Sequence, residues 1–202
     1  MTVASPLLSL PGAVAADSRD CGVAAHSGDP MLEQRRLDGG AGFVDLSHRG
    51  VVTISGADRL GWLHSLTSQH LDALAPGSST EALLLSPHGH VEHHLRLVDD
   101  GTTTWATVEP LAAPALVDFL DRMRFLMRVE VADVTADWAV VFDPLLVPDP
   151  ARVSIIGSFG REVLVPRSEL SSYAGQRSSP AGILAYEATR IAAHQPRLGI
   201  DT

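Results

Sequence analysis

The sequence predicts an α+β fold in which antiparallel sheets are flanked by helices. Of the 202 residues, 45% are apolar, which is enough to build a hydrophobic core. Several short β-rich runs are separated by turn sequences, such as residues 86–89 and 99–101, which is typical of antiparallel hairpins. Helical periodicity follows groups of strands instead of alternating with single strands, and this order favours an α+β domain over repeated βαβ units.

The N-terminal part of the chain changes character near residue 40. Residues 1–40 show little periodicity and are predicted to form an extended arm that ends in a short helix over residues 31–37. Two β-rich runs follow, at residues 43–46 and 50–54. The helix predicted next follows Ser55-Gly56, because leucines recur there at every third position: Leu60, Leu63 and Leu66.

The middle of the chain predicts three strands, a helix and a fourth strand. The strands cover residues 82–85, 91–98 and 102–108, and residues 129–134 alternate like a half-buried strand. The longest predicted helix covers residues 110–127, because its apolar side chains share one stripe: Leu111, Ala115, Leu116, Phe119, Leu120, Met123 and Leu126.

A second unit is predicted from residue 137. It contains a strand at residues 138–142, a hairpin of residues 153–156 and 162–165, and a helix at 168–174. A longer helix follows at residues 181–193. We therefore expect three parts: an extended arm (1–40), a first α+β unit (41–136) and a second, incomplete α+β unit (137–202).

Composition excludes several kinds of chemistry. All 15 basic residues are arginine, so the chain has no lysine for a Schiff base or a Walker A loop. The 24 acidic residues give a formal charge of −9, which argues against extended nucleic-acid binding. A lone cysteine, Cys21, favours a reducing compartment, and no apolar run reaches the length of a membrane span. We expect a monomeric cytoplasmic protein with no membrane or direct nucleic-acid partner.

Histidines gather in the predicted hairpin around residues 88–94. On a strand, His90, Glu92, His94 and Arg96 share a polar, alternating face that is typical of a solvated sheet surface, and Arg96 would repel a metal ion. His93 lies on the opposite, apolar face with Leu95 and Leu97. We assign no metal ligand here, and His93 is either a core histidine bonded to a carbonyl or a functional residue.

The last predicted helix places Tyr186, Glu187 and Arg190 on one side. One interpretation is an ion pair within the helix beside a half-buried tyrosine. The other is an aromatic face and a guanidinium that suit a flat heterocycle with carbonyl and carboxylate groups.

Several stretches together resemble the folate-binding aminomethyltransferase superfamily, which includes the glycine-cleavage T-protein. They are Asp45-Leu46-Ser47 with Gly56-Ala57-Asp58, the segment 62–69, the glycine hairpin 85–93, and Tyr186 to His194 with Pro196, Arg197 and Gly199. The YgfZ branch is the most similar. The resemblance implies two units of a three-domain fold around a folate pocket. The branch motif Lys-Gly-Cys-Tyr is not reached before Thr202, so we expect a C-terminally truncated chain without the C-terminal barrel domain.

The resemblance also implies the site residues. Arg49 and Tyr186 align with two aromatic positions that contact folate in the YgfZ branch, Arg49 being a departure. Arg190 aligns with the arginine that flanks the pocket, and His93 is expected to point toward its centre. These four residues would bind tetrahydrofolate or another reduced folate, and no catalytic residue is assigned. The T-protein's acidic pair is replaced by His93-His94 and its helix glutamate by Ala192, so we expect no aminomethyl transfer.

The branch implies a folate-binding accessory protein that supports iron–sulfur cluster enzymes and tRNA modification, with iron–sulfur proteins as partners. One alternative is a folate-dependent aminomethyltransferase or demethylase. The other is an inactive fragment, which an exposed apolar patch beside residues 181–200 would favour.

Overall fold

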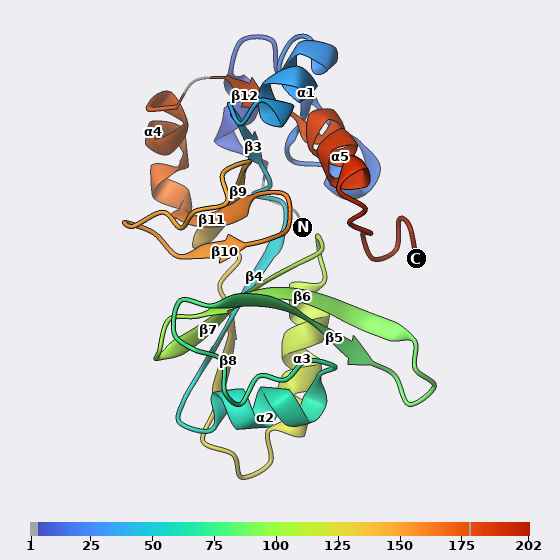
Figure 1. The fold of residues 1–202 in the computed structure, drawn as a ribbon, viewed down its shortest axis with the longest axis vertical. Helices are drawn as coiled ribbons and strands as arrows, with labels where there is room; N and C mark the ends of the chain where they lie inside the picture. Colours follow the sequence, from blue (N-terminus) through green and yellow to red (C-terminus); the bar gives the residue numbers. More distant parts are fainter. Residues whose placement is uncertain (1–3, 178) are drawn as a thin grey trace. The chain divides into compact units, whose positions relative to one another are not determined.

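The computed structural model describes residues 4–177 and 179–202. The chain divides into two compact units (Figure 1). Unit 1 combines the residues up to Arg49 with Ala136–Thr202, and unit 2 is the continuous segment Gly50–Thr135. No described helix combines the length and apolar character needed to cross a membrane.

Unit 2 is built on a five-stranded antiparallel sheet with the order β5-β6-β7-β4-β8. Its strands are β4 (Gly50–Ser55), β5 (Ser79–Leu85), β6 (Val91–Asp99), β7 (Thr103–Val108) and β8 (Glu130–Asp133). Helix α2 (Arg59–Leu66) follows β4, and α3 (Ala113–Met123) connects β7 to β8. The strands agree with the predicted ones to within a few residues, because their turns are encoded locally at 86–89 and 99–101.

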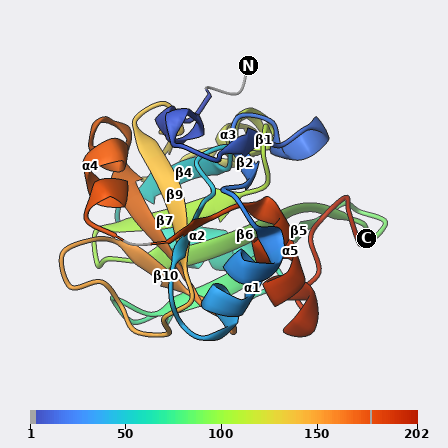
Figure 2. The same cartoon turned by 90° about the horizontal axis from the view of Figure 1, so that it is seen from above.

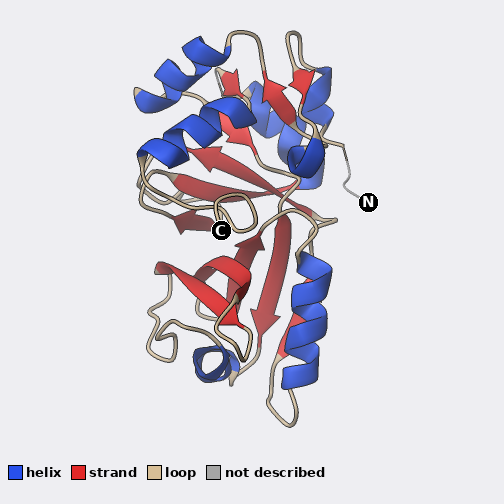
Figure 3. Ribbon diagram, turned by 90° about the vertical axis from the view of Figure 1, so that its right-hand side faces the viewer, coloured by secondary structure: helices blue, strands red, loops and turns tan. Residues whose placement is uncertain are grey.

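The core of unit 2 lies between the sheet and its two helices. Leu63 of α2 and Leu116 and Leu120 of α3 are fully buried against aliphatic side chains of the strands. The indole N–H of Trp62 donates to the carbonyl of Met123 at 3.1 Å and joins the two helices. Figure 3 shows α3 in blue beside the red strands of this unit. The packing is that of an ordinary aliphatic core.

Helix α3 is shorter than the predicted helix of residues 110–127. Leu111 and Phe125 have φ values of 65° and 46°, which an α-helix does not accommodate, and they stand outside its two ends. Leu111 and Leu126, which we predicted on the buried stripe, are 66% and 99% exposed. The periodicity located the helix but not its ends.

Unit 1 contains a second five-stranded sheet with the order β10-β11-β9-β3-β12. The strands are β3 (Phe43–Asp45), β9 (Trp138–Asp143), β10 (Ser154–Ile156), β11 (Arg161–Pro166) and β12 (Pro180–Ala181). All the pairs are antiparallel except β12–β3, which is parallel. The helices are α1 (Pro30–Asp38), α4 (Leu170–Gly175) and α5 (Ile183–Ala192), with short 3-10 turns at Pro6–Ser9, Ser18–Asp20 and Arg167–Glu169. These elements and unit 2 together confirm the predicted fold class.

The structure does not show residues 4–40 as an extended arm. They form a small antiparallel pair, β1 (Val14–Ala15) with β2 (Ala24–His26), and helix α1 packs beside α5, as Figure 2 shows. Leu7 belongs to the core that Phe43, Val141 and Val163 form. Short, irregular elements with few apolar positions carry no periodicity, so composition alone suggested an arm.

One boundary between the two units differs from the predicted one, because unit 2 begins at Gly50 and not at residue 41. Strand β3 was expected in the unit 41–136, but Val44 pairs with Phe142 and Asp45 with Val141, so β3 belongs to the sheet of unit 1. The predicted start of the second unit at residue 137 lies next to the observed one, Ala136. The strand pairing is long-range, and local patterns do not encode it.

Candidate functional site

Arg49, Tyr186 and Glu162 form a buried cluster in unit 1. Arg49 donates from Nη1 to the Glu162 carboxylate at 3.0 Å and from Nη2 to the Tyr186 hydroxyl at 3.1 Å. Its guanidinium carbon lies 5.4 Å from the centre of the Tyr186 ring. All three residues are at most 3% exposed. The ion pair is therefore shielded from water. Electrostatic interactions are stronger in such a protein interior than in solvent.

Two phenylalanines complete the surroundings of Tyr186. The Phe142 ring on β9 meets it edge-on with centroids 5.1 Å apart, and the Phe159 ring lies 5.8 Å away. The loop between β10 and β11 approaches closely because Gly160 has no side chain: a Cβ there would lie 2.4 Å from the Phe142 ring. The cluster thus places aromatic rings beside a buried cation and a buried anion.

Arg190, the third predicted site residue of unit 1, has other partners. Its Nε donates to Glu187 at 2.8 Å, and its Nη1 donates to Asp201 at 2.6 Å and to the Gln195 carbonyl at 2.9 Å. Of the two interpretations of this helix, the contacts therefore support the ion pair within the helix. The guanidinium beside Tyr186 belongs to Arg49, which lies 137 positions away in the sequence.

The Arg190 contacts belong to a larger network that joins both ends of unit 1. Arg197 donates to Glu187 at 2.7 Å and to Asp20 at 3.0 Å, and Asp20 also bonds His48 at 2.8 Å. Burial alone would raise the pKa of Asp20, but hydrogen bonds from His48 and Arg197 outweigh it and hold that pKa below its ordinary value. A cavity of about 320 Å³ borders the network and is lined in part by Asp20, Glu187 and Ile183.

His93, the fourth predicted site residue, belongs to unit 2. It pairs with the core residue Leu84 across β5–β6 and is half-buried, as its predicted apolar face requires. Its Nδ1 is buried without a hydrogen-bond partner among the described residues. Burial lowers the pKa of His93, and the carboxylate of Glu92 offsets part of this shift. The neutral form is therefore favoured.

The opposite face of β6 is less solvated than its polar alternation predicted. Arg96 is only 7% exposed, and its Nε lies 3.6 Å from Glu81. His94 bonds the same carboxylate at 3.0 Å. Alternation identified which side chains share a face, but it did not show how far that face is covered.

Glu162, Phe142 and Phe159 were not predicted as site residues. One signal was available for Glu162: a glutamate directly before the apolar run Val163, Leu164 and Val165 of strand β11, where it is fully buried. A buried carboxylate needs a charged or hydrogen-bonding partner, and Arg49 provides it. The phenylalanines carry no such signal, because aromatic side chains are ordinary in a core.

The chain is similar to known proteins in part of its sequence and in its fold. No family model matches the chain. A chloroplastic protein of Arabidopsis thaliana, provisionally named a transferase, is 27% identical over 100 residues, which cover 49% of this chain and 23% of that protein. The mitochondrial iron–sulfur cluster assembly factor IBA57 homologue of Mycosarcoma maydis is 28% identical over 112 residues, which cover 49% of this chain and 28% of that protein. The chain thus matches less than a third of the length of these curated relatives.

The structural comparison covers most of the chain. The glycine cleavage system aminomethyltransferase T of Bartonella henselae superposes with a TM-score of 0.75 over 94% of this chain and 61% of that chain, at 14% identity. At this identity the likeness establishes the fold. Together with the two related sequences it supports the predicted resemblance: the chain has the fold of aminomethyltransferase T and is similar in part of its sequence to a protein named a transferase and to an iron–sulfur cluster assembly factor.

Proposed function

We propose that this chain binds a reduced folate and acts as an accessory protein in the assembly of iron–sulfur clusters, in the cytoplasm. The observation that carries the proposal is the buried cluster of Arg49, Glu162 and Tyr186 within an aminomethyltransferase T fold. The similarity to an iron–sulfur cluster assembly factor supports the cellular role. Support of tRNA modification would follow indirectly, through iron–sulfur enzymes that modify tRNA.

The donor set of the cluster fits a reduced pterin. A pterin is flat and carries a carbonyl beside N–H and amino groups along one edge. Glu162 would accept hydrogen bonds from such N–H groups, Arg49 would donate to a carbonyl, and the Tyr186 ring would provide an aromatic contact. When bound, a reduced folate supplies a carrier for one-carbon groups. The chain's own residues bind and orient it and keep water away from the buried Arg49–Glu162 pair.

The accessory role, rather than a transferase role, is proposed because the sequence resemblance aligns Ala192 and His93-His94 with positions where the T-protein has carboxylates. Arg190 would then hold α5 and the segment after it in place through Glu187 and Asp201. The alternative of a folate-dependent transferase or demethylase is favoured by one observation, the buried carboxylate of Glu162. Because Arg49 neutralises this carboxylate, we expect no turnover of an aminomethyl donor with tetrahydrofolate. Turnover above background would favour the transferase.

One observation favours the inactive-fragment alternative. Leu184 and Ile191 are 52% and 59% exposed, and their spacing of seven places them on one face of α5. Ile200 is 44% exposed. An inactive fragment would bind no folate, so a binding measurement separates the two interpretations.

The test is calorimetric titration of the 202-residue chain with 5-formyltetrahydrofolate, a stable reduced folate. Tyr186→Phe removes the hydroxyl that Arg49 contacts but keeps the ring, and we expect binding to weaken about fivefold to tenfold. Tyr173→Phe makes the same change at a buried tyrosine of another helix, α4, and should bind like the wild type.

Each arm of the proposal has its own contradicting result. If the wild type binds no reduced folate, the folate proposal is wrong. If Tyr186→Phe binds the folate as tightly as Tyr173→Phe does, the pocket does not lie at Tyr186. Deletion of the gene in its native host should lower the activities of iron–sulfur enzymes, and unchanged activities would overturn the accessory role alone.

A further inference from the structure

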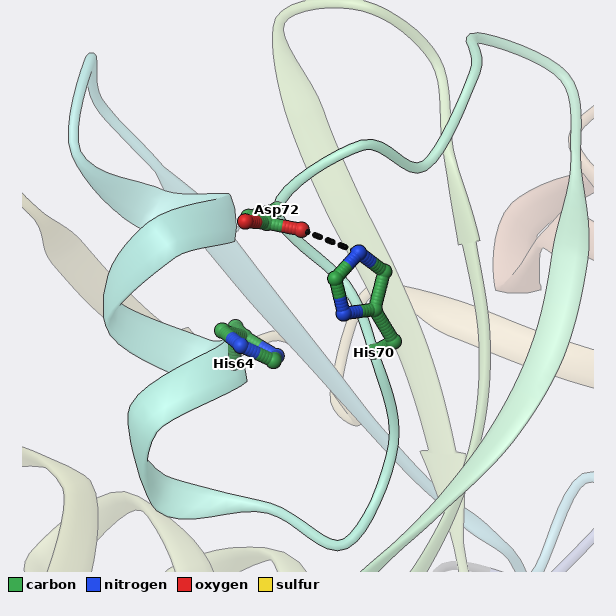
Figure 4. A group of neighbouring side chains, drawn as sticks. All are labelled: His64, His70 and Asp72. Atoms are coloured by element: carbon green, nitrogen blue, oxygen red, sulfur yellow. Dashed lines mark ion pairs between the residues drawn. The ribbon is translucent and has the colours of Figure 1, made fainter.

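Three side chains that can bind a metal ion converge on the surface of unit 2. They are His64 in the last turn of α2, and His70 and Asp72 in the segment that leads to β5 (Figure 4). One ligand atom from each residue can be chosen so that all three lie within 4.8 Å of one another. Among the described residues, no other group of three such side chains comes this close together. The histidines of the 88–94 hairpin therefore do not form a comparable group. The predicted absence of metal ligands rested on that hairpin alone.

The backbone around these residues is anchored at several points. Leu71, between His70 and Asp72, is fully buried, so its two neighbours extend toward the surface. Ser68 is bound to Leu83 of β5 by two hydrogen bonds, from Ser68 N to the Leu83 carbonyl at 2.9 Å and from Leu83 N to the Ser68 hydroxyl at 3.1 Å. Gln69 donates to Thr80 at 2.9 Å. The three side chains therefore project from a fixed frame, which reduces the entropy lost on binding an ion.

Hydrogen bonds leave a free nitrogen on each imidazole. Nδ1 of His64 lies 3.3 Å from the Gln69 carbonyl oxygen, which only accepts, so Nδ1 carries the hydrogen and Nε2 keeps its lone pair. This arrangement, with one ring nitrogen bonded to a carbonyl, is usual for metal-binding histidines. On His70, Nε2 lies 2.8 Å from Asp72 and Nδ1 is free, and an ion bound by both residues would take the place of this ion pair. The two rings meet edge-on with centroids 4.7 Å apart.

The site is open to solvent and suits a particular class of ion. The His70 and Asp72 side chains are 70% and 47% exposed, so an ion can enter without unfolding the chain. Imidazole nitrogens select zinc, cobalt, nickel or copper over magnesium or calcium. Three protein ligands leave a coordination position for water, as in zinc sites with an open position. We propose that His64, His70 and Asp72 bind a divalent transition-metal ion of the Zn²⁺ type.

The test uses the untagged, metal-stripped chain. Titration with Co²⁺ should produce the visible absorption bands of a nitrogen- and oxygen-ligated ion at one equivalent, and Zn²⁺ should displace it. His64→Gln and His70→Gln should each weaken binding at least tenfold. The matched control is the double variant His88→Gln/His90→Gln, which removes two histidines of the hairpin and should bind as the wild type does.

Three results would overturn the proposal. The first is the absence of saturable Co²⁺ or Zn²⁺ binding by the wild type. The second is equal binding by the wild type and both single variants, and the third is loss of binding in the hairpin variant, because in both cases the ion would lie elsewhere. Circular dichroism of the variants should match the wild type, since the substituted side chains are not part of the unit 2 core. Folate titration of the same variants should be unchanged, so this test is independent of the proposed function.

Discussion

The two units of the molecule are stabilised in different ways. Unit 1 buries many charged side chains, which are Glu33, Asp45, Arg49, Asp143, Arg161, Glu162, Arg190 and Arg197. Among the described residues of unit 2, Arg96 and Asp99 are the buried charged side chains, and the core is a continuous aliphatic cluster. The residues proposed to bind folate through a buried ion pair belong to the first unit. The unit that contains the candidate site is thus also the unit with more buried charged side chains.

The difference follows from how the chain builds each unit. Unit 2 is one continuous segment, in which β5–β6 and β6–β7 are hairpins and β4 pairs with the later strands β7 and β8. Unit 1 joins two segments from opposite ends of the chain. The ion pairs from Arg197 to Asp20 and from Arg49 to Glu162 connect them across 177 and 113 positions. Directional charged contacts specify which segments meet, whereas an aliphatic core is less selective.

The largest effect is expected from removing Arg197. Arg197→Met would leave the carboxylates of Asp20 and Glu187 without this partner, and we expect a loss of about 4 kcal/mol in the free energy of unfolding of unit 1. Hydrogen exchange measured by segment would follow each unit separately, and unit 2 should be unaffected. Arg19→Met is the control, because Arg19 contacts the same C-terminal segment from an exposed position. Equal losses in the two variants would contradict the network's role.

A smaller effect, located in the other unit, is expected from Leu95→Ala. Leu95 is fully buried in the aliphatic core of unit 2, and the cavity left by its truncation should cost about 3 kcal/mol. Leu85→Ala, on the adjacent strand and 45% exposed, should change stability by less than about 0.5 kcal/mol. Urea unfolding at low and high salt distinguishes the units: the Leu95 loss should not depend on salt, and a strong dependence would show that charge matters there too.

The sequence predicted the local elements of the fold and missed the long-range ones. The hairpin β5–β6, helix α2 and helix α5 follow from turn residues and apolar spacing, which are local properties. The pairing of β3 with β9 depends on residues about a hundred positions apart and could not be read from spacing. Nor could the left-handed conformation of Leu111 and Phe125, which ends α3 early, because neither residue type favours it.

The candidate site was predicted in part, for the same reason. The resemblance identified Arg49 and Tyr186, and the structure brings their side chains together. Glu162 was missed because its partner lies in a distant segment, although a glutamate directly before three apolar strand residues was a visible signal. Helical spacing predicted the ion pair of Arg190 with Glu187 as one of two interpretations, but it gave no sign of Asp201, which also binds the guanidinium.

The smallest of the predicted effects concerns pH and tests whether Asp20 carries the acid sensitivity of unit 1. Because the pKa of Asp20 is lower in the folded chain than in the unfolded one, its stabilisation is complete above the unfolded pKa of about 3.9 and is lost as the pH falls below it. Asp20→Asn should therefore be less stable than the wild type at pH 6, and the difference should shrink as the pH falls from about 5 to 3. Asp17→Asn, at an exposed position nearby, should follow the wild type throughout. A constant difference between Asp20→Asn and the wild type would mean that Asp20 acts through its hydrogen bonds to His48 and Arg197 irrespective of its charge, and the electrostatic account of unit 1 would then be wrong at this residue.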